Sequence, residues 1–322
     1  MPLLVIIITF LYKYILYIKE KNNYYFLYNE KHFADKKWEE WGARSVCVID
    51  SLIFLPKKTT ISYIKNNLAE HVSCYHLPQD IEYLNKKNPS VYYLIKNTQQ
   101  TIEKLLDKLP IKIKYLTTKD KNKIKNEFHL VWSEFFINKE IPDFEVIEDL
   151  PYQYIEDTIA NNNDYVEIII IDQAVTEKQS SALAILIMAS DDIIKKYHID
   201  IMANVQRPML IAEDENYQEA LNIFREIQID SNSANYVILD NKSNSNIIAV
   251  LFNNDSPLNK ISLDNTMDLE YFIGPLGDYS SWITISLSVN FTCQYEENVI
   301  SLSYEENGFY INTVIVNKEQ MK

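Results

Sequence analysis

Glycine is scarce in this chain. Four glycines occur among 322 residues, at Gly42, Gly274, Gly277 and Gly308, where average usage predicts about 22. Nucleotide-binding loops of the Walker, dinucleotide and kinase types need several glycines close together, because the backbone must turn tightly and approach phosphates. The closest pair, Gly274 and Gly277, is stiffened by Pro275. We therefore expect no nucleotide and no other cofactor.

Positive charge is also in short supply. The net charge is -14, and a negative field opposes the binding of nucleic acid. Residues 1–130 carry 21 Lys/Arg and 13 Asp/Glu, which leaves 10 against 32 for residues 131–322. The first part is thus near +8 and the second near -22. This acidic second part favours a basic partner.

The N-terminus, in contrast, is rich in apolar residues. Residues 3–12 form an apolar run, which resumes after Lys13 over residues 14–18. Its length is close to that of the shortest membrane spans. No basic residue precedes it and no small-residue cleavage site follows it, so it does not resemble a signal peptide. We expect a membrane anchor over residues 1–19 and a spacer over 20–40. The alternative is a buried strand and the start of a helix.

The basic residues near this run lie after it, at Lys19, Lys21, Lys31, Lys36 and Lys37. The positive-inside rule then predicts a single-pass protein of an inner membrane with its body in the cytoplasm. The cysteines are three in number and widely spaced, which fits a reducing compartment and no disulfide framework. The alternative is a cytoplasmic protein without an anchor.

Apolar β-rich runs alternate with helical patterns in the rest of the chain, which predicts an α/β class with mixed sheets. The run 165–172 is the clearest candidate for a central buried strand. Further strands are expected over 45–55, 111–116, 183–189, 236–240, 247–252, 299–303 and 309–316. Helices are expected over 59–68, 97–109, 122–137, 155–159, 193–197 and 216–227.

Residues 282–291 fit either a helix or a strand. The charge change near residue 140 is flanked by Pro142 and Pro151, and it predicts an N-terminal α/β lobe over 41–140 and an acidic C-terminal α/β lobe over 141–322. No repeat of fixed period is visible in the sequence.

Candidates for chemistry are few. His71, Cys74 and His76 lie close together, but one such cluster lacks the second pair of ligands that a zinc site needs. Cys74, between two histidines, is the only candidate for a reactive thiol. Cys47 and Cys293 belong to apolar segments, where a thiol is usually inert.

Acidic residues are expected to have structural roles. Asp172 ends the predicted central strand and is expected to begin a turn or cap a helix. The alternative is a catalytic base or metal ligand at the carboxyl edge of the sheet. Asp191 and Asp192 are expected to cap and begin a helix. The pair Glu305 and Glu306 is typical of a solvated face. The sequence contains no Gly-x-Ser-x-Gly motif, which places the nucleophilic serine in many hydrolases. We therefore predict no catalytic, cofactor-binding or metal-ligating residue.

The order of elements resembles a degenerate thiolase or ketosynthase fold. The resemblance rests on the opening strand, the helix over 216–227, the strand 236–240, the stretch 274–289 and the terminal hairpin. Such enzymes need a nucleophilic cysteine at a helix start, with histidine or lysine to activate it. Here position 278 is Asp and no histidine follows His198. The resemblance therefore implies a pseudoenzyme.

A second resemblance is to the type VI secretion lipase-adaptor family. It rests on the predicted N-terminal anchor, the stretches 77–80 and 109–113, and the pair formed by 165–172 and 183–192. Members of that family hold a toxic lipase and load it onto a secreted spike. The resemblance implies a non-enzymatic, membrane-anchored adaptor or chaperone for a protein cargo. The alternatives are an immunity protein that binds a toxin, and a degenerate acyl-transfer enzyme.

Overall fold

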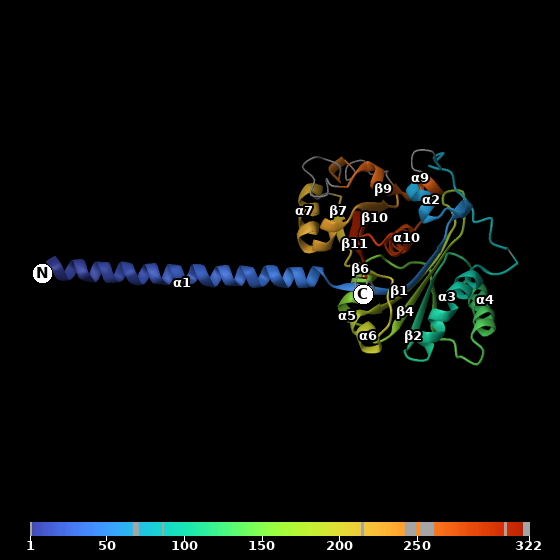
Figure 1. The fold of residues 1–322 in the computed structure, drawn as a ribbon, viewed down its shortest axis with the longest axis horizontal. Helices are drawn as coiled ribbons and strands as arrows, with labels where there is room; N and C mark the ends of the chain where they lie inside the picture. The colour runs from blue at the N-terminus through green and yellow to red at the C-terminus, as the bar shows by residue number, and fades with distance from the viewer. Residues whose placement is uncertain are drawn as a thin grey trace.

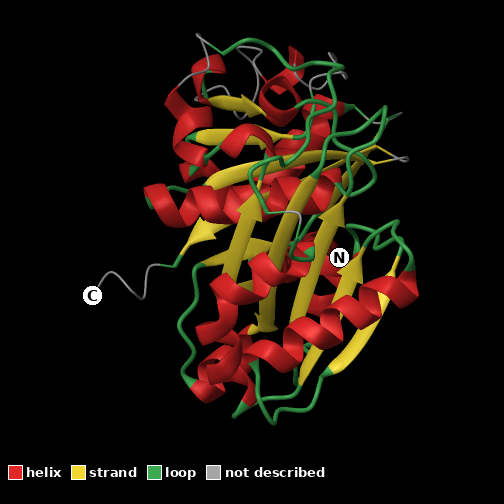
Figure 2. Ribbon diagram, turned by 90° about the vertical axis from the view of Figure 1, so that its right-hand side faces the viewer, coloured by secondary structure: helices red, strands yellow, loops and turns green. Residues whose placement is uncertain are grey.

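The structure, a computed structural model, describes residues 2–66, 71–85, 87–213, 216–241, 249–251, 261–305 and 308–317. A long N-terminal helix extends from a body built around one mixed sheet (Figure 1). The strands run through the centre of this body (Figure 2). The predicted α/β class is confirmed.

The first half of the sheet has the strand order β3-β2-β4-β5-β1. The pairs β2–β3 and β2–β4 are parallel, whereas β4–β5 and β5–β1 are antiparallel. All eight residues of β4 are buried, as expected for a strand covered on both faces. The strands are β1 (Ser45–Phe54), β2 (Ile111–Leu116), β3 (Asp143–Ile147), β4 (Val166–Gln173) and β5 (Ala182–Ser190).

The second half repeats this arrangement. Its order is β9-β8-β10-β11-β6, with parallel pairs β8–β9 and β8–β10 and antiparallel pairs β10–β11 and β11–β6. Strands β1 and β6 pair antiparallel and join the halves, and β7 (Met209–Ala212) pairs with β11. The strands are β6 (Ala203–Gln206), β8 (Tyr236–Leu239), β9 (Thr266–Asp268), β10 (Val299–Glu305) and β11 (Gly308–Val316).

The chain therefore contains a structural duplication. No repeat was visible in the sequence. The reason is that the two halves share strand order and strand direction but no recognisable sequence pattern. The predicted lobe boundary near residue 140 falls inside the first half, since β2 pairs with both β3 and β4. The repeat divides between β5 and β6.

Helix α10 (Ser280–Tyr295) is the central helix of the body. Its residues from Ser281 to Val289 are all buried, and it packs with strands of both halves in one apolar cluster. Because it is surrounded on every side, its sequence shows no amphipathic period, and this is why residues 282–291 also fitted a strand. Helix α5 (Tyr154–Asn161) contributes to the same cluster.

Other helices cover the outer faces. Helices α3 (Ser90–Leu106) and α4 (Lys121–Phe135) pack on the first half of the sheet, and α7 (Tyr217–Ile227) packs on the second half. Short helical segments complete the described chain: η1 (Pro56–Lys58), α2 (Ile61–Asn66), α6 (Asp191–Tyr197), η2 (Ile229–Ser233), η3 (Leu263–Asn265) and α9 (Leu269–Ile273).

One predicted strand is wrong. Residues 249–251, within the strand expected over 247–252, are helical, and the rest of that prediction lies outside the described residues. Helix α3 begins at Ser90, seven residues before its predicted start, because Pro89 fits the N-terminal boundary of a helix. The short strands β3, β6, β7 and β9 were not predicted, because three to five residues carry too little periodicity.

The N-terminal prediction also needs correction. Residues 2–42 form one continuous helix, α1 (Pro2–Gly42), in place of an anchor and a spacer. Its side chains are exposed over residues 3–41, and seventeen of those from Leu3 to Phe26 are large and apolar. No helix in the described part of the chain is both long enough and apolar enough to cross a membrane. Lys13 interrupts the apolar run, and Lys19 and Glu20 end it.

Candidate functional site

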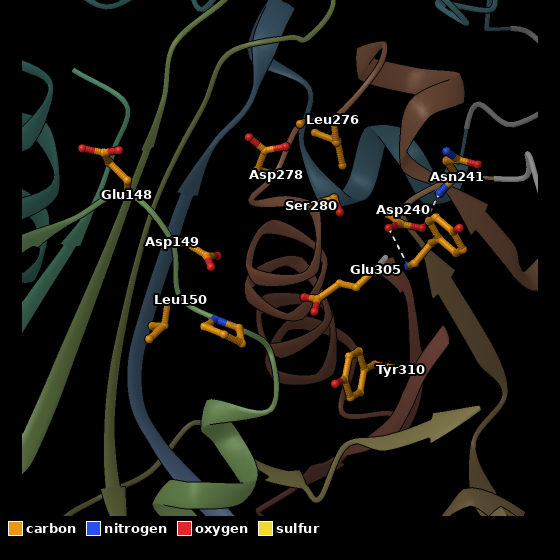
Figure 3. Close-up of a pocket in the computed structure, with 13 residues that line it drawn as sticks. Glu148, Asp149, Leu150, Asp240, Asn241, Leu276, Asp278, Ser280, Glu305 and Tyr310 are labelled. Atoms are coloured by element: carbon orange, nitrogen blue, oxygen red, sulfur yellow. Dashed lines mark hydrogen bonds between the residues drawn. The ribbon is translucent and has the colours of Figure 1, made fainter. Parts of the chain in front are cut away.

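A cavity of about 900 Å³ lies where segments from both halves of the sheet meet. Figure 3 shows Glu148 and Asp149 on one side, Asp240 and Glu305 on the other, and α10 between them. The lining comes from the β3–α5 connection, the end of β8, the start of α10 and the β10–β11 hairpin: Glu148, Asp149, Leu150, Pro151, Asp240, Asn241, Leu276, Gly277, Asp278, Ser280, Tyr304, Glu305 and Tyr310.

The first turn of α10 fixes one wall of the cavity. The buried Trp282 donates its indole N–H to the carbonyl of Leu150 at 2.7 Å. The Tyr279 hydroxyl donates to the carbonyl of Glu148 at 2.8 Å. Buried Tyr and Trp side chains usually find such partners because an unpaired polar group is costly in the interior. These two bonds hold the β3–α5 connection against the central helix.

Asp240 forms the opposite wall and is only 5% exposed. Its carboxylate accepts backbone N–H groups of Tyr304 at 2.9 Å and Asn241 at 2.7 Å (Figure 3). Burial raises the pKa of Asp240 to about 7, although these N–H donors and the Ser280 hydroxyl act to lower it. A buried carboxyl with a pKa near neutrality can hold or release a proton under physiological conditions.

Glu305 ends β10 beside the start of α10. Its Oε1 accepts the hydroxyl of Ser281 at 2.9 Å, and its charge, after burial, is a second cause that raises the pKa of Tyr310. The prediction that the pair 305–306 is merely solvated is wrong for Glu305, which lines the cavity. Residue 306 lies outside the described residues.

The cavity is acidic. Its lining includes five carboxylates, and the described lining residues include no cysteine, histidine, lysine or arginine. One of the five, Glu148, also pairs with Lys121 at 3.1 Å, and this ion pair is exposed. An acidic concave surface repels anions and attracts cations. It provides no thiol to attack a carbonyl and no cationic donor to stabilise an oxyanion.

The cysteines lie elsewhere. Cys47 is buried in β1, and burial, with the nearby charge of Asp191, raises its pKa to about 12. Cys293 is exposed near the end of α10, and partial burial is the main cause that raises its pKa. Such shifts disfavour the thiolate, which is the reactive form. Neither thiol lines the acidic cavity.

The histidine and cysteine cluster predicted from the sequence forms only in part. His71 and Cys74 are in contact, with Nε2 3.7 Å from Sγ, whereas no contact joins His76 to that sulfur among the interactions recorded for the described residues. No group of three His, Cys, Asp or Glu side chains in the described ranges is arranged to hold a metal ion.

Asp172 is buried and forms an ion pair with the partly exposed Lys119. Lys119 Nζ approaches both carboxylate oxygens at 2.8 Å, and the buried Tyr115 donates its hydroxyl to Oδ2 at 2.8 Å. Asp172 was predicted to begin a turn, but its side chain pairs with a residue 53 positions earlier in the chain. No local sequence pattern could indicate such a distant partner. Asp191 and Asp192 occupy the first turn of α6, as predicted, but the N-cap position belongs to Ser190 and not to Asp191.

Asp149, Asp240 and Asp278 line the cavity, but the sequence did not indicate that they belong to one site. Each follows or precedes a predicted element, at positions where acidic residues are common for local reasons. Their only shared signal was the strongly acidic composition of residues 131–322. Convergence of four separate segments depends on the duplicated topology, which was not visible in the sequence.

Comparison with known proteins identifies the fold. The sequence matches no protein-family model, and no curated protein matches it. Several solved structures are similar. A type II polyketide ketosynthase, in a complex with its acyl-carrier protein and a bound hexaketide, has a TM-score of 0.54 at 10% identity. The match covers 85% of this chain and 99% of that one.

Two further solved structures have a similar fold. A variant of OleA from Xanthomonas campestris with cerulenin has a TM-score of 0.52 at 9% identity, covering 86% of this chain and 98% of that one. The 3-oxoacyl-[acyl-carrier-protein] synthase III of Aquifex aeolicus has a TM-score of 0.50 at 11% identity, covering 84% and 100%.

These comparisons lend no support to the predicted resemblance to type VI lipase adaptors. At such low identities a structural match establishes architecture and says nothing about activity. The resemblance predicted from the order of elements is confirmed at that level: this chain has a thiolase- and ketosynthase-like fold.

Proposed function

We propose that this chain is a non-catalytic adaptor that binds a protein partner through its acidic cavity. The observation that supports the proposal is the lining of that cavity, which has five carboxylates and, among the described residues, no cysteine, histidine, lysine or arginine. A partner that presents Lys or Arg side chains fits this surface, because charge complementarity selects partners and speeds their encounter.

The same lining argues against acyl transfer, the alternative that the fold suggests. A transferase of this architecture needs a thiol that can reach the substrate carbonyl, and a donor group that stabilises the developing oxyanion. Among the described lining residues the ionisable side chains are carboxylates and two tyrosines, and burial raises the pKa of Cys47 to about 12.

A protein partner fits better than a small cation. No three potential metal ligands in the described chain are clustered, so the carboxylates do not form a metal cage. They are spread over four segments around a wide cavity, which suits several basic side chains on one surface. A secreted effector held for delivery, such as a type VI lipase, is one candidate, and a toxin held by an immunity protein is the other.

Capture from a lysate of the native organism, at moderate salt, tests the proposal. The bait is the full chain, beside a cavity variant with Glu148→Gln, Asp149→Asn and Asp278→Asn. A matched control carries Glu134→Gln, Glu177→Gln and Asp200→Asn, which are exposed carboxylates outside the cavity. We expect one protein retained by the wild type and the control and lost from the cavity variant.

Retention of the same protein by all three baits would show that the cavity is not the binding site. Turnover of an acyl thioester by the purified chain would overturn the non-catalytic proposal itself. If a partner is captured, an assay of its activity in the complex separates an adaptor, which preserves that activity, from an immunity protein, which inhibits it.

A further inference from the structure

Cys74 lies in a cluster of polar side chains separate from the acidic cavity. Its Sγ is 3.5 Å from Nζ of Lys57 and 3.7 Å from Nε2 of His71. The backbone N–H of Cys74 donates to the carbonyl of Tyr271 in α9 at 2.8 Å. The sulfur is thus fixed between a cationic donor and an imidazole that come from two different segments.

The imidazole is held in place. Tyr63 OH is 2.8 Å from Nδ1 of His71, and the imidazole packs against the ring of Phe272 with centroids 4.9 Å apart. Burial, followed by the charge of Lys57, lowers the pKa of His71, so the ring is neutral near pH 7. With Nδ1 engaged by Tyr63, Nε2 faces the sulfur, where it can take up or return a proton.

The backbone around the sulfur is strained. Lys57, Lys58 and His76 have φ angles of 55°, 58° and 59°, in the left-handed region that non-glycine residues rarely adopt. Three of the seven described residues of this kind therefore belong to the two segments that surround Cys74. Such conformations persist where the surrounding structure enforces them, and they concentrate at functional sites.

We propose that Cys74 is a nucleophilic thiol that small hydroperoxides oxidise to a sulfenic acid. The sulfur attacks the distal peroxide oxygen, so that an S–O bond forms and the O–O bond breaks. Sulfur loses two electrons and the peroxide is reduced. The thiol proton passes first to the neutral His71, and the protonated imidazole then gives it to the leaving hydroxide, so hydrogen peroxide yields water, while Lys57 stabilises the thiolate. The reversible step ends at Cys–SOH.

The neighbours of Cys74 explain both its burial and its reactivity. The side chain is 2% exposed, yet Val72, two residues earlier, is 84% exposed, so the loop lies at the surface. The sulfur is covered in part by Lys57, an exposed residue with a flexible side chain. A shift of that side chain admits a molecule as small as hydrogen peroxide. A nearby Lys or His is the usual environment of a reactive cysteine.

The other two cysteines provide internal references. Cys47 is buried in β1, and burial raises its pKa to about 12. Cys293 is exposed, but partial burial, followed by the acidic neighbours Asp50 and Glu296, raises its pKa. Simple exposure predicts that Cys293 reacts first, whereas the proposal predicts that Cys74 does. This inference is independent of the proposed binding function.

The test uses the reduced, full-length chain, hydrogen peroxide at low molar excess, and dimedone to trap sulfenic acid. Peptide mass spectrometry then gives a rate for each cysteine. We expect trapping at Cys74 about tenfold faster than at Cys293. Trapping at Cys74 that is no faster than at Cys293 would overturn the proposal.

Two lysine variants separate the role of Lys57 from a general effect of charge. Lys57→Met removes the donor at 3.5 Å from the sulfur, and we expect the Cys74 rate to fall about tenfold. Lys58→Met is the matched control, because Lys58 has a similar φ but its Nζ lies over the ring of Tyr83. Equal rates in the two variants, with circular dichroism unchanged, would remove Lys57 from the mechanism.

Discussion

The guanidinium of Arg207 lies against the indole of Trp41, with its central carbon 4.1 Å from the ring centroid. Arg207 also forms an ion pair with Glu156 of α5, and its side chain is 4% exposed. This stack joins the end of α1 to the body. Next to it, a Cβ on Gly42 would lie 2.1 Å from the side chain of Ile227, so α1 and α7 approach closely.

We expect Glu156→Gln to lower the free energy of unfolding by about 3 kcal/mol, because it leaves Arg207 buried without its counter-charge. Burial already raises the pKa of Glu156 and lowers that of Arg207, so desolvation outweighs their attraction. The double variant with Arg207→Met should therefore lose less than the single one. Urea unfolding measures both, and Asp107→Asn, which breaks an exposed pair with Lys139, should cost less than about 1 kcal/mol.

Asp240 makes stability depend on pH. Its folded pKa of about 7 lies above the ordinary value of 3.8, so the folded state keeps a proton that the unfolded state loses between these values. Stability therefore falls as pH rises from about 4 to 7, by on the order of 4 kcal/mol. Asp240→Asn removes the ionisable group and with it this pH-dependent contribution to stability. Denaturant titrations at several pH values should show a wild-type-minus-variant difference that declines over this window and is flat above it. A constant difference from pH 4 to 8 would contradict the assignment.

We expect the hydrogen bond of the Trp282 indole to contribute more to the free energy of unfolding than the volume that the indole fills beyond a phenyl ring. Trp282→Phe removes the donor to Leu150 and leaves that buried carbonyl short of a partner, at a cost of about 1–3 kcal/mol. Trp132 is equally buried but its indole nitrogen has no partner in the described structure. Trp132→Phe is therefore the control, and chemical denaturation should show the smaller loss for it.

Gly274 and Gly277 should respond differently to alanine. At Gly274, with φ of 80°, a Cβ would lie 2.3 Å from the backbone carbonyl oxygen of Leu77. We expect a loss of about 2–4 kcal/mol from the strained φ and the clash. At Gly277 the nearest atom belongs to the flexible side chain of Gln179, which can move, so the loss should stay near 1 kcal/mol. Thermal melts of both variants test this order.

The far part of α1 should be irrelevant to the stability of the body. Ile7 and Leu11 are half exposed and lie far from the body along α1. Ile7→Lys and Leu11→Lys together should leave the melting temperature of the body unchanged and reduce self-association, because exposed apolar patches promote it. Light scattering measures the association. A drop in melting temperature would mean that this segment packs on the body.

The sequence predicted the fold best where burial left a simple pattern. The continuous run that became β4 and the amphipathic helix α7 were both placed correctly. The buried part of α10, residues 281–289, shows no helical period in its sequence, and strands of three to five residues such as β6 and β9 are too short to show a pattern.

The candidate site was less accessible to prediction than the fold. The acidic character of the second part of the chain was visible, but the cavity depends on contacts between the connection after β3 and residues more than 90 positions later. The Lys119–Asp172 pair has the same long-range character. By contrast, His71 and Cys74 are three residues apart, and this contact could be anticipated from the sequence.

Helix α1 projects far beyond the body of the molecule (Figure 1). Its 41 residues, at about 1.5 Å per residue, form a rod roughly 60 Å long. The stack of Trp41 on Arg207 holds the end of α1 against the body. Whatever meets the far tip is held a full rod length from the point of attachment. If the tip and the body each bind a partner, α1 would separate those two partners by its own length.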